Sequence, residues 1–477
     1  MKAPFSAYLN QIEPALETLI AKLGKNYEYV SALATDSPAF SAQVTKGSMN
    51  ISSDALTSER GIVFRLCKNG HYMEYALNEF DPDHVEETEK EIEETMAMQE
   101  KVLQETGTKI YDTPVLKDEP DEIFYEAEAE ELPEKADAEG IMAVLKEKYD
   151  ETVKAHPELL NVFLNVSATH ISKMFLSAHK HLKQSYVISQ MYAMMFAMAG
   201  DHVEQGMGAD SGLCGLEILK HMDEQINHAL QQLDALVHAG RIVPGEYEIV
   251  TSPEVTGVIA HEAFGHGMEM DMFVKNRALA KEKMGTRIGS DLVTMHEGAL
   301  CAKGVTSYAF DDEGTRAGDV TEIRNGMLEN GIADALSAAR LGIEPTGNGK
   351  RQNFEHKVYT RMTNTLFDSG TSTKEEMIAS VKHGYLLEGL RSGMEDPKHW
   401  GIQCILQLGR EIKDGKLTGK VVAPIIMTGY VPDLLGSISM ASKDREVFGS
   451  GYCGKGYKEF VKVTDGGPYL KTKARLG

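Results

Sequence analysis

The residues best suited to chemistry lie in VIAHEAFGHGMEMD, residues 258–271, which places His261, Glu262 and His266 in a small and apolar run. Two imidazoles can bind one metal ion, and a carboxylate beside them can move a proton. On a regular α-helix an i to i+4 spacing separates two side chains by about 40°, whereas an i to i+5 spacing separates them by about 140°. His261 and His266 are five positions apart, so they cannot share a metal ion from a regular helix.

A π-type widening within AFG, residues 263–265, would bring the two histidines to the same side of the helix, and such bulges favour functional sites. Gly265 and Gly267 flank His266 and ease this distortion, each at a helix-propensity cost of about 1 kcal/mol. The apolar entry VTGVIA predicts a buried or half-buried helix, in which an unsatisfied His-Glu-His cluster would be costly. We therefore expect a locally distorted helix that carries a HExxxH metal motif.

A catalytic zinc site uses three protein ligands and keeps one coordination position for water. Glu262 could take a proton from the metal-bound water and pass it to the leaving amine of a cleaved peptide. The two histidines are one protein ligand short, and spacing alone leaves the third open. The local candidates are Glu269, Asp271, His296, Glu297 and Cys301, and the distant one is Cys453 in the glycine-dense FGSGYCGKGY.

Five cysteines are scattered along the chain without a CxxC pair, namely Cys67, Cys214, Cys301, Cys404 and Cys453. An odd and dispersed set is typical of a reducing compartment, where most cysteines are small buried hydrophobic residues. We expect all but Cys453 to be structural.

Three motifs together resemble the TldD side of the TldD/TldE (PmbA-like) metallopeptidase family: HEAFGHGMEMD (261–271), RMTNT (361–365) and GSGYCGKG (449–456). The N-terminal ERGIVFRLCKNGHYMEYALNEFDPD (59–83) is similar in type to the first domain of that family. The resemblance implies a zinc peptidase. It implies that the ligands are His261, His266 and Cys453, and that the acid/base residue is Glu262.

The same resemblance implies a dimer that encloses a cavity for unfolded peptides, either a homodimer or a heterodimer with a motif-less paralogue. The TldE-type subunit lacks HExxxH, so the intact motif indicates the catalytic type. Dipeptidyl peptidase III also uses HExxGH, but it takes its third ligand from an EExxxE-like element that this sequence lacks.

Thr363 and Asn364, within RMTNT, are candidates for binding substrate. A strand edge can bind an extended peptide through backbone hydrogen bonds that do not depend on its side chains. The motif precedes a turn-like FDSGTST, and the family resemblance points the same way, so we expect these two residues to flank such an edge.

The coarse pattern of the chain predicts an α+β fold of two domains. Residues 1–240 form an N-terminal α/β domain with an antiparallel-rich sheet and flanking helices, and within it residues 84–140 form an acidic helical and loop insert. We expect a loop over 111–140, which is rich in Pro and Glu. After RIVPGEYEIVTSP glycine becomes frequent and short β-type runs dominate, so residues 241–477 form a β-rich domain that carries the HExxxH helix.

The formal charge of −23 is concentrated in one segment, since residues 81–140 hold 22 Asp and Glu against 5 Lys and Arg. Such a surface repels phosphates, which argues against a nucleic-acid partner. The N-terminus shows no secretory signal, and no apolar run approaches the 18 residues of a membrane helix. We expect a cytoplasmic protein with no membrane partner.

These observations together predict a zinc-dependent peptidase that hydrolyses peptide bonds in unfolded or flexible peptides. The alternative is a non-catalytic peptide-binding or scaffold subunit of a TldD/TldE-like dimer, in which the motif has become structural. The intact Glu262 between two intact histidines favours the enzyme.

Overall fold

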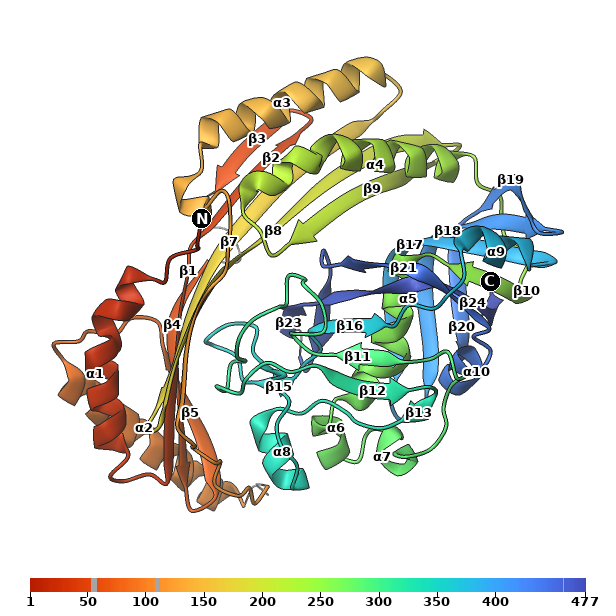
Figure 1. Cartoon of the computed structure of the whole chain (residues 1–477). Coiled ribbons are helices and arrows are strands. Elements are labelled where there is room, and N and C mark those ends of the chain that lie inside the picture. Colours follow the sequence, from red (N-terminus) through yellow and green to blue (C-terminus); the bar gives the residue numbers. More distant parts are fainter. Residues whose placement is uncertain (53–57, 108–110, 458) are drawn as a thin grey trace.

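Two large β-sheets form the protein, which is described here by a computed structural model over residues 1–52, 58–107, 111–457 and 459–477. Strands β1–β9 make a nine-stranded sheet, and eleven later strands make the second. The first sheet is long and curved, and the C-terminal half of the chain lies against its concave face (Figure 1). The predicted α+β class is confirmed.

The first sheet is antiparallel except at one pair. The long β7 pairs with β8 along one side and with β2 and then β1 along the other. The strands are β1 (Tyr29–Ser37), β2 (Ala39–Thr45), β3 (Ser48–Ser52), β4 (Glu59–Lys68), β5 (His71–Leu77), β6 (Asp121–Glu126), β7 (Asn161–Ser177), β8 (Lys180–Ala199) and β9 (His202–Gly212). A hairpin joins β4 to β5 through Asn69 and Gly70, both with positive φ, as a tight two-residue turn requires.

Four long helices cover the convex face of this sheet (Figure 1). They are α1 (Ala7–Leu23), α2 (Val85–Thr106), α3 (Ala138–Ala155) and α4 (Met222–Val237). The apolar stripes of α1 and α2 bury against β1, β4 and β5, and those of α3 and α4 bury against β2, β7 and β8. The opposite, concave face is therefore left for the C-terminal half.

The acidic segment differs from the sequence prediction in one respect. Its first part is the expected helix, α2, but residues 121–126 of the expected loop form β6, which pairs in parallel with β8. Ile123 points into an apolar cluster while Phe124 is 65% exposed. The alternation of one buried and one exposed face is the pattern of an edge strand, and it is hidden in the sequence by the surrounding glutamates.

The second sheet curls into a closed circuit, because β10 pairs with both β17 and β24 and these are linked through β18 and β20. The strands are β10 (Gly245–Thr251), β11 (Met295–Glu297), β12 (Val320–Arg324), β13 (Met327–Leu328), β16 (Asn364–Phe367), β17 (His383–Asp396), β18 (Gly401–Lys413), β19 (Lys416–Val422), β20 (Ile425–Tyr430), β21 (Met440–Phe448) and β24 (Thr464–Leu476). Two small sheets pair β14 (Gly349–Lys350) with β15 (Tyr359–Thr360), and β22 (Tyr452–Lys455) with β23 (Glu459–Lys462).

Helix α5 (Pro253–Ala260) is the central element of this half, and its side chains belong to the same core as those of β17, β18, β20 and β24. The remaining helices are short: α6 (Asp271–Val274), α7 (Ala280–Lys283), α8 (Ala335–Leu341), α9 (Lys374–Ala379) and α10 (Val431–Gly436). Within the described residues, no helix combines the length and the apolar character needed to cross a bilayer.

A segment of the C-terminal half, residues 308–316, joins the two halves, and we call it the bridging loop. Its Glu313 forms an ion pair with Arg65 of β4, and its Asp312 forms one with Lys173 of β7. All four side chains are buried or nearly so. The concave face of the first sheet is therefore held to the second half by charges as well as by apolar contacts.

Candidate metal centre

Helix α5 leads directly into the HExxxH motif. Ser252 begins the helix by accepting a hydrogen bond from the backbone N–H of Val255, and Pro253 occupies its first turn. After Ala260 the chain continues without a break through a π-helical turn, η3 (His261–Gly265), and a 3-10 turn, η4 (His266–Met268). The widening predicted from the spacing is confirmed.

The widened turn places the two imidazoles side by side. The ring centroids of His261 and His266 are 5.1 Å apart, and the ring planes are nearly perpendicular at 89°. Gly265 is required here by packing, because a Cβ on it would lie 2.1 Å from the sulfur of Met362. A Cβ on Gly267 would lie 2.8 Å from a carboxyl oxygen of Glu395. The glycines therefore permit close packing against the motif as well as its distortion.

Cys453, on β22, completes a group of three ligand atoms that all lie within 4.8 Å of one another. Its Sγ is 3.3 Å from Nε2 of His266, and the thiol is 5% exposed. Tetrahedral zinc holds nitrogen at about 2.0 Å and sulfur at about 2.3 Å, which sets neighbouring ligands about 3.5 Å apart. The group therefore fits a metal ion with little movement.

The other candidates for the third ligand are engaged elsewhere. Glu269 lies on the far side of His266, 3.1 Å from Nδ1, and Asp271 pairs with lysines. The ring of His296 lies near the carboxylates of Asp319 and Asp368. The carboxylate of Glu297 accepts hydrogen bonds from Thr363, Thr365 and Asn348. The thiol of Cys301 donates a hydrogen bond to the carbonyl of Asn364. Among these candidates only Cys453 has its ligand atom close to those of both histidines.

The three groups shift one another's protonation. Burial opposes ionisation of the Cys453 thiol, but the charges of His261 and His266 outweigh it and hold its pKa well below the usual range. Burial likewise disfavours imidazolium at His266, yet Cys453 and Glu269 raise its pKa well above the usual value. A thiolate is thus stabilised where a metal ion would require one.

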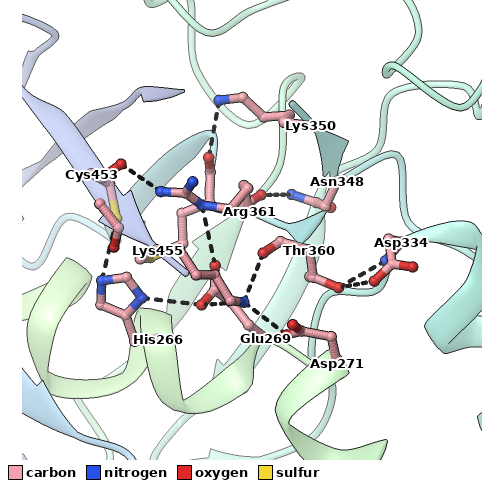
Figure 2. A network of polar contacts seen from close by, with 12 residues as sticks. His266, Glu269, Asp271, Asp334, Asn348, Lys350, Thr360, Arg361, Cys453 and Lys455 are labelled. Atoms are coloured by element: carbon pink, nitrogen blue, oxygen red, sulfur yellow. Dashed lines mark hydrogen bonds and ion pairs between the residues drawn. The ribbon is translucent and has the colours of Figure 1, made fainter. Parts of the chain in front are cut away.

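A network of buried charges supports the group from behind (Figure 2). Lys455 donates to Glu269 at 3.0 Å and to Asp271 at 2.7 Å, and it also donates to the carbonyl of Thr360 at 3.0 Å. Through Glu269 this network reaches Nδ1 of His266. The imidazole is therefore fixed by a carboxylate that is itself fixed by a lysine, as is common for metal-binding histidines.

Arg361 ties the cysteine to the same network (Figure 2). Its guanidinium donates to the backbone carbonyl of Cys453 at 2.5 Å, and its Nε lies 3.9 Å from Glu269. Only 1% of this side chain is exposed, which makes it the largest fully buried side chain of the chain's described part. One buried guanidinium thus contacts the backbone of one candidate ligand, Cys453, and the carboxylate that lies behind another, His266.

Glu262 is half-buried and lines a cleft of about 890 Å³ together with His261, His266 and Cys453. It packs over Gly393 of β17, where an added Cβ would lie 2.5 Å from Cγ of Glu262. The carboxylate is thus placed beside the candidate ligands and open to the cleft.

Two further carboxyls border Glu262, and the sequence analysis did not identify either. Burial, together with the charge of Glu262, raises the pKa of Glu395 well above its usual value. Burial also raises the pKa of Asp465 to about 6.

Sequence signals for the supporting residues were few. Arg361 lies inside the motif RMTNT and Lys455 lies inside the motif GSGYCGKG, and this was the only signal for either. Glu395 and Asp465 carried no such signal.

Thr363 and Asn364 do not flank a free strand edge, which corrects that expectation. Asn364 begins β16, which is paired on one side with β11 and on the other with β24. Both side chains are fully buried, Thr363 donating to Glu297 and Asn364 to the carbonyls of Gly298 and Ala299. The turn-like FDSGTST that follows and the family resemblance had suggested an edge, but both side chains form their hydrogen bonds inside the sheet.

Comparison with known families identifies the C-terminal half. Residues 244–473 match the PmbA/TldA metallopeptidase C-terminal domain. A metalloprotease of Methanocaldococcus jannaschii is 32% identical over 289 residues, which are 60% of this chain and 62% of that protein. A zinc metalloprotease TldD homolog of Saccharolobus solfataricus is 32% identical over 232 residues, 48% of this chain and 51% of that protein. The chain thus spans less than two thirds of the length of these curated relatives.

The whole fold has counterparts among solved structures. TldE from Thermococcus kodakarensis superposes with a TM-score of 0.77 at 18% identity, over 97% of this chain and 100% of that one. At this identity the likeness shows the fold alone. The match over residues 244–473 confirms the predicted resemblance for the C-terminal half of the chain, which is similar to the PmbA/TldA metallopeptidase C-terminal domain.

Proposed function

We propose that the chain is a zinc-dependent peptidase that hydrolyses peptide bonds in unfolded or flexible peptides. The observation that carries this proposal is the convergence of His261, His266, Cys453 and Glu262 on one cleft of about 890 Å³. Relatives that carry the name metalloprotease support it.

The chemistry of the donor set fits zinc, which binds imidazole nitrogen and thiolate sulfur. Nδ1 of His261 is buried and has no hydrogen-bond partner among the residues the structure describes. Buried polar atoms are nearly always partnered, so an unpartnered ring nitrogen beside a stabilised thiolate favours a site built for a cation. His261, His266 and Cys453 would hold it.

Bound zinc would supply a Lewis acid beside the scissile carbonyl and the attacking water. Glu262 takes one proton from that water as its oxygen bonds to the carbonyl carbon. It then delivers the proton to the amide nitrogen as the C–N bond breaks, so that the amine leaves neutral. The open cleft admits an extended chain, which is why flexible peptides are the expected substrates.

Metal content and cleavage of an unstructured peptide library test the proposal in wild type, Cys453→Ala and Glu262→Gln. Wild type should hold about one zinc per chain and cut. Cys453→Ala should lose metal and activity together, whereas Glu262→Gln should keep metal and lose at least about 100-fold in kcat. Cys214→Ala, which removes a thiol that does not line the cleft, is the matched control.

A wild-type chain that stays metal-free on reconstitution and cuts nothing would instead support the peptide-binding or scaffold role. Pairing with a second copy or with a motif-less paralogue stays a prediction from the family resemblance. Light scattering on the purified chain, alone and mixed with such a paralogue, measures it directly.

A further inference from the structure

The cleft of the candidate metal centre is locally basic, although the chain as a whole carries −23. Its lining contains five cations, Lys275, Arg277, Lys357, Arg391 and Lys455, and four carboxyls, Glu262, Glu269, Glu395 and Asp465. Positive charge therefore exceeds negative charge in this cleft, against the balance of the molecule.

Three of the five cations already have carboxylate partners in the chain. Lys455 and Lys275 both pair with Asp271, at 2.7 and 3.0 Å. Arg391 pairs with Glu204 of β9 at 3.2 Å. These three charges are neutralised locally and add little attraction for a ligand.

Lys357 and Arg277 are different. Neither side chain forms an ion pair or a side-chain hydrogen bond with any residue in the described ranges. Both are exposed and line the cleft. Of the cleft's cations, these two are the ones available to a bound molecule.

Lys357 also lies near two other lysines, because the ammonium groups of all three surround the ring of Tyr359. Its Nζ is 4.3 Å from the ring centroid of Tyr359, and the Nζ atoms of Lys275 and Lys455 are 5.8 and 6.0 Å from the same centroid. Burial and the charge of Lys275 lower the pKa of Lys357, while Glu459, Asp271 and Asp334 oppose this only from beyond ion-pair distance. An anion bound at this point would relieve the repulsion between the lysines.

We propose that Lys357 and Arg277 form a carboxylate-binding subsite of the substrate cleft. This inference rests on the proposed peptidase function and adds to it a substrate class, namely peptides that carry a negative group a short distance from the cleaved bond. A lysine supplies a point charge, and an arginine can bind both carboxylate oxygens in its planar fork. The carboxylate comes either from the C-terminus of the peptide or from an Asp or Glu side chain.

Three fluorescent peptides of one unstructured sequence test the subsite. The first is neutral with an amidated C-terminus, the second has a free C-terminal carboxylate, and the third is amidated with one internal Asp moved along the sequence. Their Kd values are measured by anisotropy on zinc-loaded Glu262→Gln, which prevents turnover, alone and combined with Lys357→Met or Arg277→Met. Arg391→Met, which removes a cation of the same cleft that is already paired, is the control.

We expect at least one acidic peptide to bind about 5- to 10-fold more tightly than the neutral one at low salt, and the preference to shrink as salt screens it. Lys357→Met and Arg277→Met should abolish the preference while the Kd of the neutral peptide, the zinc content and the Tm stay unchanged. Arg391→Met should retain the preference. The free-carboxylate and internal-Asp peptides identify the source of the group.

Equal affinity for all three peptides would overturn the subsite, and it would leave the peptidase standing if wild type still cuts them. Retention of the preference in both Lys357→Met and Arg277→Met would also overturn it. Conversely, a preference that depends on Lys357 in a chain whose wild type cuts nothing would retain the subsite and refute the peptidase. The two failures are therefore distinguishable.

Discussion

The imidazole of His266 is held from two directions. One ring nitrogen faces Sγ of Cys453 at 3.3 Å and the other faces Glu269 at 3.1 Å. A carboxylate behind a metal-binding histidine fixes its tautomer and its orientation, so the residues that determine metal affinity extend beyond those that would touch the ion. Arg361 and Lys455 belong to this outer set through their contacts with Glu269.

Replacement of Glu269 by Gln should therefore weaken zinc binding without removing a ligand. The amide keeps the shape of the side chain but loses the charge that orients His266 and balances Lys455. We expect the zinc Kd to rise by about 10- to 100-fold, as measured by competition with a chelator of known affinity. Glu282→Gln, at an exposed position, should leave the Kd unchanged. An unaltered Kd in Glu269→Gln would show that the carboxylate does not support the ligand.

A second prediction at this scale concerns Glu322 of β12, which is fully buried and has no hydrogen-bond partner for either carboxyl oxygen among the described residues. Burial, with the nearby Glu297, raises its pKa well above the usual 4.5. The folded chain therefore keeps this proton above pH 4.5 while the unfolded chain releases it. Unfolding free energy should fall as pH rises from there, by up to about 1.4 kcal/mol per pH unit from this group.

Glutamine cannot ionise in either state, so Glu322→Gln should show a smaller fall in unfolding free energy between pH 5 and pH 8. Urea unfolding at several pH values, with chelator held constant, measures the two slopes. The slope is the readout, because any constant cost of the amide cancels from it. Parallel slopes for wild type and Glu322→Gln would contradict the assignment.

At the scale of the element, the turn η3 shows what spacing can reveal. The interval between His261 and His266 excluded a regular helix, and the two flanking glycines indicated where the distortion would be tolerated. This inference needed only helix geometry. The partner that packs on Gly265, the sulfur of Met362, comes from a strand region almost a hundred residues later, and no local pattern reports such a contact.

Gly265→Ala should consequently distort the metal centre. The new methyl group would lie 2.1 Å from the sulfur of Met362, little more than the length of a covalent C–S bond, and overpacking of this kind costs about 1–3 kcal/mol. We expect lower unfolding free energy and weaker zinc binding, both partly recovered in the double variant Gly265→Ala with Met362→Ala. Gly436→Ala, where an added Cβ meets nothing within 4 Å, is the control. Failure of the second change to recover either property would place the constraint elsewhere.

The strands were predictable to different degrees. The antiparallel-rich sheet of the N-terminal half was evident in the sequence because period-two alternation and turn residues are local signals. Strand β6 was missed because acidic residues dominate its neighbourhood, and the edge role given to Thr363 and Asn364 was wrong because β16 is paired on both sides. Pairing partners are set by tertiary structure, which a single sequence does not display.

At the scale of the whole molecule, each large sheet draws its strands from one side of residue 240. We propose that the boundary between two domains lies there. The bridging loop then acts as the tie between them, since Glu313 and Asp312 reach across to Arg65 and Lys173.

Removal of one partner of this tie should be costly, because it leaves a buried charge without its counter-charge. We expect Arg65→Met to lower the unfolding free energy by about 3–5 kcal/mol and to speed proteolysis between residues 238 and 245. The matched control is Arg60→Met, which breaks an ion pair with Asp36 in which the arginine is half exposed, and such pairs contribute about 1 kcal/mol or less. Equal effects of the two variants would contradict a tie made by the buried pair.

The position of the cysteine along the chain has a consequence of its own. Cys453 lies 187 positions after His266, so an ion held by both would close a very long loop of the chain. A cross-link of that span removes so much freedom from the unfolded chain that it favours the folded state by about 5 kcal/mol in the entropic view. Chelation should accordingly lower the Tm of wild type but hardly that of Cys453→Ala, so zinc supply would govern the lifetime of the protein as well as its chemistry.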